Sequence, residues 1–218
     1  MKKNFFSKIR QYTETVFLEG DDFCTPSYTY SDKPSKKCDE AIMSTRAMAS
    51  IVAEAYANGE NESGGVMLGT IKDGKAYIVE ATDPGYGAEH SPTIHEMNKR
   101  YVNYVYRVLS RLYKKELRLV GFWHRHPGRF NRFSSLDDNA NLEYAKVVGG
   151  GTLSFILNFT PSPKLTCYYF DCSDGEYHPV KLTVSDKILA KDGYLKYAAE
   201  RDFCARAEDM QNEMKGYA

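Results

Sequence analysis

The chain has 218 residues, 42% hydrophobic and 27% charged, which is enough for one well-buried domain and short for two. Lysine plus arginine and aspartate plus glutamate both total 29, so the zero net charge gives no support to a nucleic-acid or membrane partner. The lysine-rich start lacks the apolar stretch of a signal peptide, and no apolar run reaches the roughly 18 residues of a membrane span. We therefore expect a cytoplasmic protein that acts on a protein or a peptide.

The cysteine pattern argues against a disulfide framework and against a cysteine zinc site. The number of cysteines is odd, and no two of them are spaced as Cys-x-x-Cys. We expect them to be reduced thiols of a cytosolic protein. They are Cys24, Cys38, Cys167, Cys172 and Cys204.

The first third of the chain predicts an extension followed by a helix. Residues 1–40 combine strand-forming residues at 12–18 with a loop rich in Ser, Pro, Lys and Tyr at 25–37. Residues 39–58 carry apolar side chains at helical spacing, and Gly59 follows as a stop signal.

A strand pair is expected next. Residues 64–71 are small or apolar, which is typical of a buried strand that another group approaches closely. Asp73 and Gly74 are a hairpin turn signal into a second strand at 75–81. The glycines and prolines of residues 82–91 predict a loop.

The clearest helix signal follows that loop. Thr93 with Glu96 three residues later forms a capping box, so we expect the helix to begin beside Ile94. Its apolar face would consist of Ile94, Met97, Tyr101, Val105, Val108 and Leu112. We interpret its cationic positions as a solvated face rather than a ligand site; they are Lys99, Arg100, Arg107, Arg111 and Lys114.

Residues 117–126 predict a strand buried on both faces, because apolar residues occupy both alternating sets of positions. Alternate residues of a strand share a face, so His124 and His126 point the same way and can hold one ion. Pro127 and Gly128 end the strand. The pair alone would also fit two core histidines that fell two apart by chance.

A carboxylate completes this set of candidate ligands. Ser134 or Ser135 can cap a helix that runs to about Val148, which places Asp137 in the first turn, where the helix dipole favours a negative charge. Two neutral imidazoles and one carboxylate leave a fourth position open, as in catalytic zinc sites. The sequence contains no zincin, zinc-deaminase or phosphate-loop signature.

The remaining part of the chain predicts more strands and a terminal helix. Residues 152–159 and 165–171 are strand-like and are separated by a proline turn; 177–184 adds another strand, and helical spacing begins at Ser185. This order of elements predicts an α/β domain with a mixed, curved sheet packed against helices.

The pattern His-x-His-Pro, with a serine eight and an aspartate eleven residues after the second histidine and an upstream Glu62 in Glu-Ser-Gly-Gly-Val-Met-Leu-Gly, resembles the JAMM (MPN+) metalloprotease family. The resemblance covers roughly residues 41–170 and implies the MPN fold, which is cytidine-deaminase-like. It implies a catalytic domain at 41–171, between an N-terminal extension at 1–40 and a C-terminal strand and helix extension at 172–218 that packs on it.

The resemblance also assigns roles. It implies one zinc ion on His124, His126 and Asp137, with Glu62 as the general base that handles the proton of a zinc-activated water. Ser134 would help to hold the oxyanion of the tetrahedral intermediate. The alternatives are that Glu62 is an ordinary surface residue and that Ser134 is only a helix cap. No organic cofactor is implied.

Other residues of the motif region suggest packing or depart from the family. Trp123 alternates with the ligands and should face away from the metal. Arg125 replaces the small polar residue usual between the family's histidines, and Phe133 stands where many members have proline. Three further histidines have no partner spacing and are interpreted as surface or capping residues: His90, His95 and His178.

The resemblance implies a zinc metallopeptidase that hydrolyses the amide or isopeptide bond after the C-terminal tail of a ubiquitin-like protein. The sequence of the motif is most similar to that of bacterial members, which are associated with such modifiers, their conjugates and their activating and conjugating enzymes. One alternative is a non-catalytic scaffold or binding module of the same fold. Another is a peptidase that releases an amino acid from a sulfur-carrier protein.

Overall fold

The computed structural model describes residues 37–113, 117–148 and 150–188. The expectations for residues 12–18 and for most of 25–37 lie outside the described part of the chain, as do Cys24 and Cys204. The three described cysteines, Cys38, Cys167 and Cys172, are free thiols, as expected.

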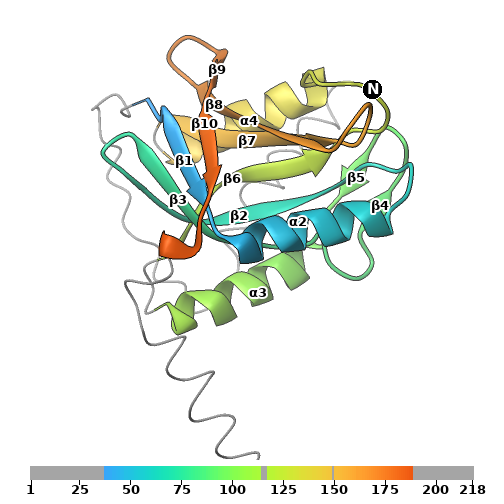
Figure 1. Cartoon of the computed structure of the whole chain (residues 1–218), viewed down its shortest axis with the longest axis horizontal. Coiled ribbons are helices and arrows are strands. Elements are labelled where there is room, and N and C mark those ends of the chain that lie inside the picture. Colours follow the sequence, from blue (N-terminus) through green and yellow to red (C-terminus); the bar gives the residue numbers. More distant parts are fainter. Residues whose placement is uncertain (1–36, 114–116, 149, 189–218) are drawn as a thin grey trace, which may run out of the picture.

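Eight strands form one mixed sheet in the order β10-β1-β3-β2-β6-β7-β8-β9 (Figure 1). Pairing is parallel between β1 and both of its neighbours and between β6 and β7, and antiparallel elsewhere. The strands are β1 (Glu40–Met43), β2 (Ser63–Lys72), β3 (Lys75–Ala81), β6 (Arg118–Arg125), β7 (Gly151–Asn158), β8 (Lys164–Asp171), β9 (Glu176–Pro179) and β10 (Lys181–Val184).

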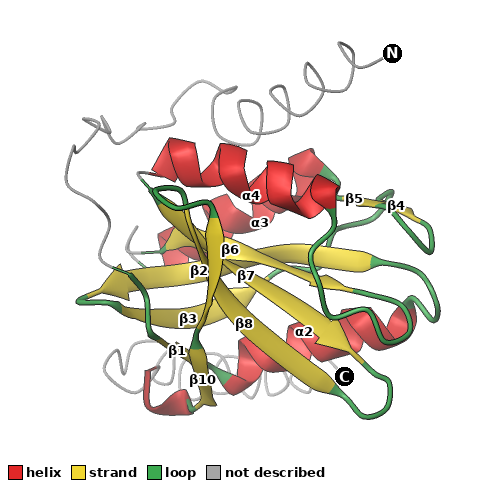
Figure 2. Ribbon diagram, turned by 90° about the horizontal axis from the view of Figure 1, so that it is seen from above, coloured by secondary structure: helices red, strands yellow, loops and turns green. Residues whose placement is uncertain are grey.

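Helices cover both faces of this sheet. Helix α2 (Thr45–Ala57) lies on one face, whereas α3 (Lys99–Leu112) and α4 (Ser135–Val148) lie on the other (Figure 2). The side chains of the strands separate accordingly: Met67 packs with the α2 cluster, and its neighbours Val66 and Leu68 pack with α3. Burial on both faces explains why β2 and β6 are almost continuously apolar.

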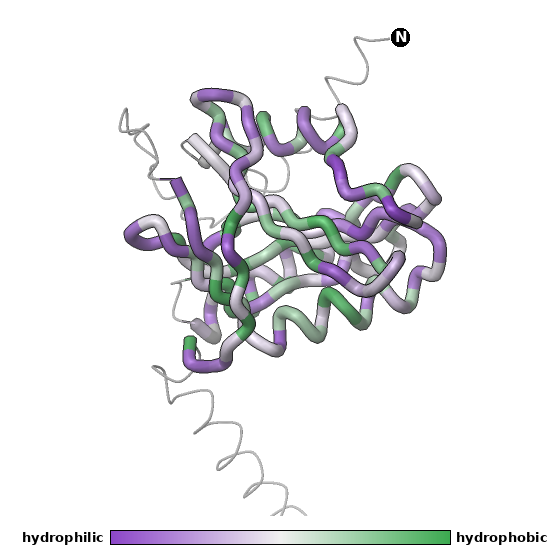
Figure 3. Tube along the Cα trace, turned by 45° about the horizontal axis from the view of Figure 1, so that its top comes forward, coloured by the Kyte–Doolittle hydropathy of each residue, from purple (hydrophilic) through white to green (hydrophobic). Residues whose placement is uncertain are grey.

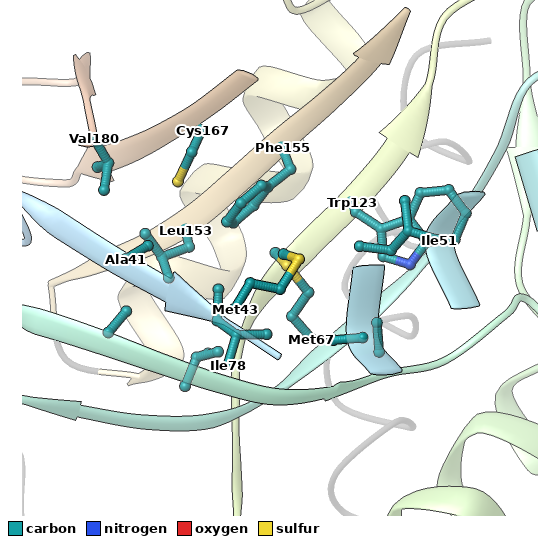
Figure 4. Packing of buried hydrophobic residues seen from close by; sticks show 14 of the residues in the cluster. Ala41, Met43, Ile51, Met67, Ile78, Trp123, Leu153, Phe155, Cys167 and Val180 are labelled. Carbon is teal, nitrogen blue, oxygen red and sulfur yellow. The ribbon is translucent and has the colours of Figure 1, made fainter. Parts of the chain in front are cut away.

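The larger core lies between α2 and the concave face of the sheet. Ile51 of α2 lies near Trp123 of β6, and Met67 and Phe155 continue the cluster across β2 and β7 (Figure 4). Apolar residues follow the central strands and the inner side of α2, while the loops are mostly hydrophilic (Figure 3). Removing this apolar surface from water is the main stabilising contribution to such a domain.

The sheet is so strongly curved that it nearly closes. The β8–β9 hairpin leads into Val180, whose N–H donates to the Cys167 carbonyl, and β10 then crosses to pair with β1. The backbone N–H of Lys181 donates to the carbonyl of Asp39 at this crossing. The predicted strand at 177–184 is therefore two strands that belong to opposite ends of the sheet.

Two predicted helix starts were wrong. Residues 40–43 form β1 rather than helix, because Ser44 caps α2 by accepting from the Ala47 N–H at 3.0 Å. The helix expected from Ile94 begins only at Lys99, with Asn98 as its cap. Residues 89–96, predicted to be the end of a loop and the start of this helix, instead form the hairpin of β4 (Glu89–His90) and β5 (His95–Glu96).

The other described elements agree with the sequence. The predicted strands at 64–71, 75–81, 117–126, 152–159 and 165–171 correspond to β2, β3, β6, β7 and β8. Asp73 and Gly74 both have positive φ, as the predicted hairpin turn requires. Of the helix expected after Ser185, the described residues include one 3-10 turn, Asp186–Ile188. None of the helices described is long and apolar enough to cross a membrane.

Burial predicts unequal effects for two chemically identical substitutions. Ile51→Ala, in the core, should lower the free energy of unfolding by about 2–5 kcal/mol, because it leaves a cavity that the sheet cannot close. Ile71→Ala, at a position that is 41% exposed, should cost less than half as much. Urea unfolding of both variants measures the difference, and equal losses would contradict the packing of α2 described above.

Candidate metal centre

The two histidines lie at the C-terminal end of the central strand β6. His124 lies within β6 and pairs with Gly64 of β2, while His126 follows the last strand residue. The His126 N–H still donates to the Leu157 carbonyl of β7, at 3.1 Å, so the extended backbone continues through it. Both imidazoles are buried, each with a side chain that is 7% exposed.

Helix α4 supplies the carboxylate, in the first turn as predicted. The Asp137 N–H donates to Ser134 Oγ at 3.3 Å, and the Ser134 N–H donates to Asp137 Oδ2 at 2.7 Å. This reciprocal pair is a capping box, so the cap that starts the helix also orients the carboxylate. Ser134 is therefore the N-cap, as one of its two interpretations required, and its hydroxyl is exposed beside the site.

The three side chains converge on one point. The Nε2 atoms of His124 and His126 are 2.9 Å apart, and each is 3.6 Å from an Asp137 carboxylate oxygen. Ligand atoms at roughly 2.0–2.2 Å from a tetrahedral zinc ion would be separated by about 3.3 Å. The observed separations bracket that value, so the donor set fits a zinc ion with one position left for water or substrate.

The second nitrogen of His126 is occupied. Its Nδ1 lies 3.2 Å from the Phe130 carbonyl, and because a carbonyl only accepts, this nitrogen carries the proton. Nε2 is left with its lone pair toward the candidate metal position. Such outer hydrogen bonds hold the ring orientation of a metal ligand.

Burial and nearby charges favour the metal-binding protonation states of His124 and Asp137, whereas they make His126 easier to protonate. Burial lowers the pKa of His124 to about 3, so its imidazole is neutral. For His126, burial alone would lower the pKa, but the hydrogen bond and charge of Asp137 and the charge of Glu62 outweigh it and raise the pKa. The Asp137 carboxyl loses solvation, yet bonds from His126 and Ser134 and the nearby His124 hold its pKa well below the ordinary range.

Glu62 lies where β2 begins, at the same end of the sheet. The β2–β6 register pairs Ser63 with Arg125, so Glu62 is level with His126. Burial raises the pKa of its carboxyl, the positive charge of His126 opposes that shift, and Asp137 adds to it. A carboxylate with a raised pKa beside a metal position is suited to accept and return a proton near neutral pH.

Two histidines that were interpreted as surface or capping residues belong to this region. The His95 ring is stacked 6.3 Å from His124, and a Cβ on Gly64 would overlap its Nε2 atom. Burial lowers the pKa of His95 to about 4. His90 lies beside Glu62, with Nδ1 2.9 Å from the Glu62 carbonyl. Sequence spacing did not identify either histidine, because both reach the site through the fold of the β4–β5 hairpin, which is distant in sequence from His124 and His126.

Trp123 packs as predicted. It faces away from the histidines, is 1% exposed and donates from Nε1 to the Thr82 carbonyl at 2.9 Å. The two residues that depart from the family pattern, Arg125 and Phe133, both make contacts in the structure. Arg125 is buried over the Phe159 ring, and the Phe133 ring contacts His124 at a centroid distance of 5.8 Å.

A comparison with known protein families shows which family the chain belongs to. The model for prokaryotic homologs of the JAB domain, Prok-JAB, matches residues 44–162, which is more than half of the chain. The chain belongs to the Prok-JAB family. The match includes β2, β6 and α4, and the curved mixed sheet with its three helices is a JAB/MPN-like fold. JAB domains include both active JAMM peptidases and inactive members.

Solved structures with a related fold include one from a bacterium. The solution structure of protein DSY2949 from Desulfitobacterium hafniense matches with a TM-score of 0.51 over 66% of this chain and 92% of that one. The two sequences are 14% identical, so the similarity concerns the fold alone. No curated protein matches the chain.

A second group of metal-binding side chains provides a control for the first. Asp171, Asp174 and His178 also lie close together, but His178 Nε2 is 2.9 Å from Asp174, and Lys37 contacts both residues. His126→Ala should lose stoichiometric zinc, because it removes one of three ligands, whereas His178→Ala should keep it. Elemental analysis of the two purified variants measures this, and full zinc in the His126 variant would exclude the assigned ligand set.

Zinc affinity should also depend on pH. A histidine ligand must be neutral, and the raised pKa of His126 means that it is the first imidazole of this site to protonate as the pH falls. Affinity should therefore be highest above that pKa and fall about tenfold per pH unit below it. Competition with a chromophoric chelator from pH 8 to pH 5 measures the slope; a flat profile would contradict this ordering of the ligands.

Proposed function

We propose that this Prok-JAB protein is a zinc metallopeptidase that hydrolyses the amide or isopeptide bond after the C-terminal tail of a ubiquitin-like protein. The observation that carries the proposal is the convergence of His124, His126 and Asp137 beside Glu62. Inactive members of such a fold would be expected to lack part of this set.

The three ligand side chains would hold the ion. Zinc, when bound in such a site, lowers the pKa of a water molecule to about 7 and polarises a carbonyl group. Glu62 is not one of the ligands, and its carboxylate is free to take the proton of the attacking water and to deliver it to the leaving nitrogen. One carbon–nitrogen bond is thereby replaced by a carbon–oxygen bond, with the acid and the amine as products.

Ser134 is suited to assist at the carbonyl oxygen. Its Oγ accepts from the Asp137 N–H, which fixes the oxygen but leaves the hydroxyl proton available to a substrate. A donor of this kind stabilises negative charge as it develops on the oxygen. The helix cap and the oxyanion contact are compatible roles for one side chain.

The surroundings favour a narrow, extended substrate. The histidines are almost fully buried, and the site is flanked by the β4–β5 hairpin and by the Gly128–Phe133 segment. A tail that ends in small residues such as Gly-Gly can reach such a position, and it could add its backbone to a sheet edge. Conjugates of the modifier and the activating and conjugating enzymes of the same system are the partners that we propose.

Two alternative functions can be distinguished from the proposed one by experiment. A scaffold would bind its partner without zinc-dependent turnover. A peptidase that trims a sulfur-carrier protein would use the same residues on a different substrate. Trapping with a Glu62→Gln variant and mass identification of the bound modifier separates these substrates, because the inactive enzyme keeps its binding surface.

Loss of the base should separate metal binding from turnover. Glu62→Gln should retain zinc but lower the hydrolysis rate about 10²- to 10⁴-fold, which is the usual contribution of a general base. Glu60→Gln, two residues away on the exposed side of the same loop, is the matched control and should keep full activity. Both zinc content and turnover are measured on one preparation, and undiminished turnover in Glu62→Gln would place the base elsewhere.

Substrate width can be tested with the trapped modifier. Fusions that carry Gly, Ala or Leu immediately before the scissile bond should be cleaved in that order of decreasing rate, since the buried ligands leave little room for a branched side chain. Rates come from gel densitometry under first-order conditions. Equal rates for Gly and Leu would contradict the narrow approach, although the zinc chemistry would stand.

A further inference from the structure

The backbone of Glu62 is held from outside the metal ligands. Its N–H donates to the Ser91 carbonyl at 2.7 Å, and its carbonyl lies 2.9 Å from His90 Nδ1. Because the acceptor is a carbonyl, Nδ1 is the protonated nitrogen of His90. Both polar groups of the Glu62 backbone are thus satisfied by two consecutive residues of the β4–β5 hairpin.

Glu62 needs such support because of its place in the chain. It precedes the first residue of β2, so it is not itself paired with β6, and it follows the turn at residues 58–61. From the other side, Arg125 Nη1 donates to the Asn61 carbonyl at 2.9 Å. The segment before β2 is therefore fixed by one side chain from the histidine strand and by one from the hairpin.

The hairpin also reaches the candidate ligands. His90 pairs with His95 across it, and the His95 ring lies against His124 and Gly64. Its turn is closed by the Ser91 N–H donating to the Ile94 carbonyl at 2.8 Å and by the Ile94 N–H donating to Ser91 Oγ at 3.0 Å. A closed turn makes the hairpin one unit that touches both the base segment and a ligand.

We propose that His90 is a positioning residue for Glu62, and that the β4–β5 hairpin sets where the general base stands relative to the ligands. The proposal rests on the proposed function for its catalytic consequence, but the docking of the Glu62 segment on the hairpin can be tested without turnover. A base displaced by about 1 Å can lose on the order of a hundredfold in rate, so a single backbone contact can matter. His90 contacts the Glu62 backbone, not a substrate, so its loss should act on kcat.

The test compares side chains that differ in one donor. His90→Asn places an amide N–H near the position of Nδ1, whereas His90→Leu has a similar size and no donor. His90→Leu and His90→Ala should keep zinc and lower kcat about 10- to 100-fold with KM within about twofold. His90→Asn should restore most of kcat. His178→Ala, which removes an imidazole from the edge strand β9, serves as the control.

A second measurement is independent of activity. The Glu62 N–H donates to the Ser91 carbonyl, so its hydrogen exchange reports whether the segment stays docked on the hairpin once the neighbouring His90 bond to the Glu62 carbonyl is lost. Followed by NMR in the zinc-loaded full chain, this amide should be protected in the natural protein and in His90→Asn and should exchange faster in His90→Leu. Faster exchange in His90→Leu, together with no turnover in the natural protein, would support the positioning role of His90 and reject the proposed function. Unchanged exchange and unchanged kcat in His90→Leu would overturn the positioning role of His90, as would a loss of kcat that His90→Asn does not restore.

Discussion

The antiparallel pairing of β2 with β6 is the constraint on which the site depends. It places Glu62, at the start of one strand, beside the histidines at the end of the other. Glycine is required for it, because a Cβ on Gly64 would overlap the backbone carbonyl of Trp123 in β6. The small-residue run of β2 therefore serves close approach rather than flexibility.

The electrostatics of the centre arise from its position between sheet and helix. Burial keeps the His124 imidazole neutral, while the capped N-terminus of α4 stabilises the charged form of Asp137. The same capping box starts the helix and aims the carboxylate, so local folding and assembly of the site are one event. The segment of Glu62, the proposed general base, is held by a separate element, the β4–β5 hairpin, which also contacts His124 through His95.

Sequence reasoning succeeded where the determining interactions are local. The alternation of His124 and His126, the serine cap before Asp137 and the Asp-Gly turn each follow from a few neighbouring residues. It failed at His90 and His95, whose places depend on a hairpin meeting distant strands. The capping box at residues 93–96 was misleading for the same reason: those residues bond across a hairpin, and the helix begins after it.

The ends of the large sheet bear on how the protein meets other chains. Its outermost strands, β9 and β10, have four residues each, and Pro179 and Lys181 flank the crossing between them. Short edges that carry proline and charge discourage strands of other molecules from adding, which protects a curved sheet against self-association. The two-stranded β4–β5 sheet is separate from these edge strands. An extended substrate could therefore pair beside the histidines while the edges of the large sheet still resist pairing with other copies of the protein.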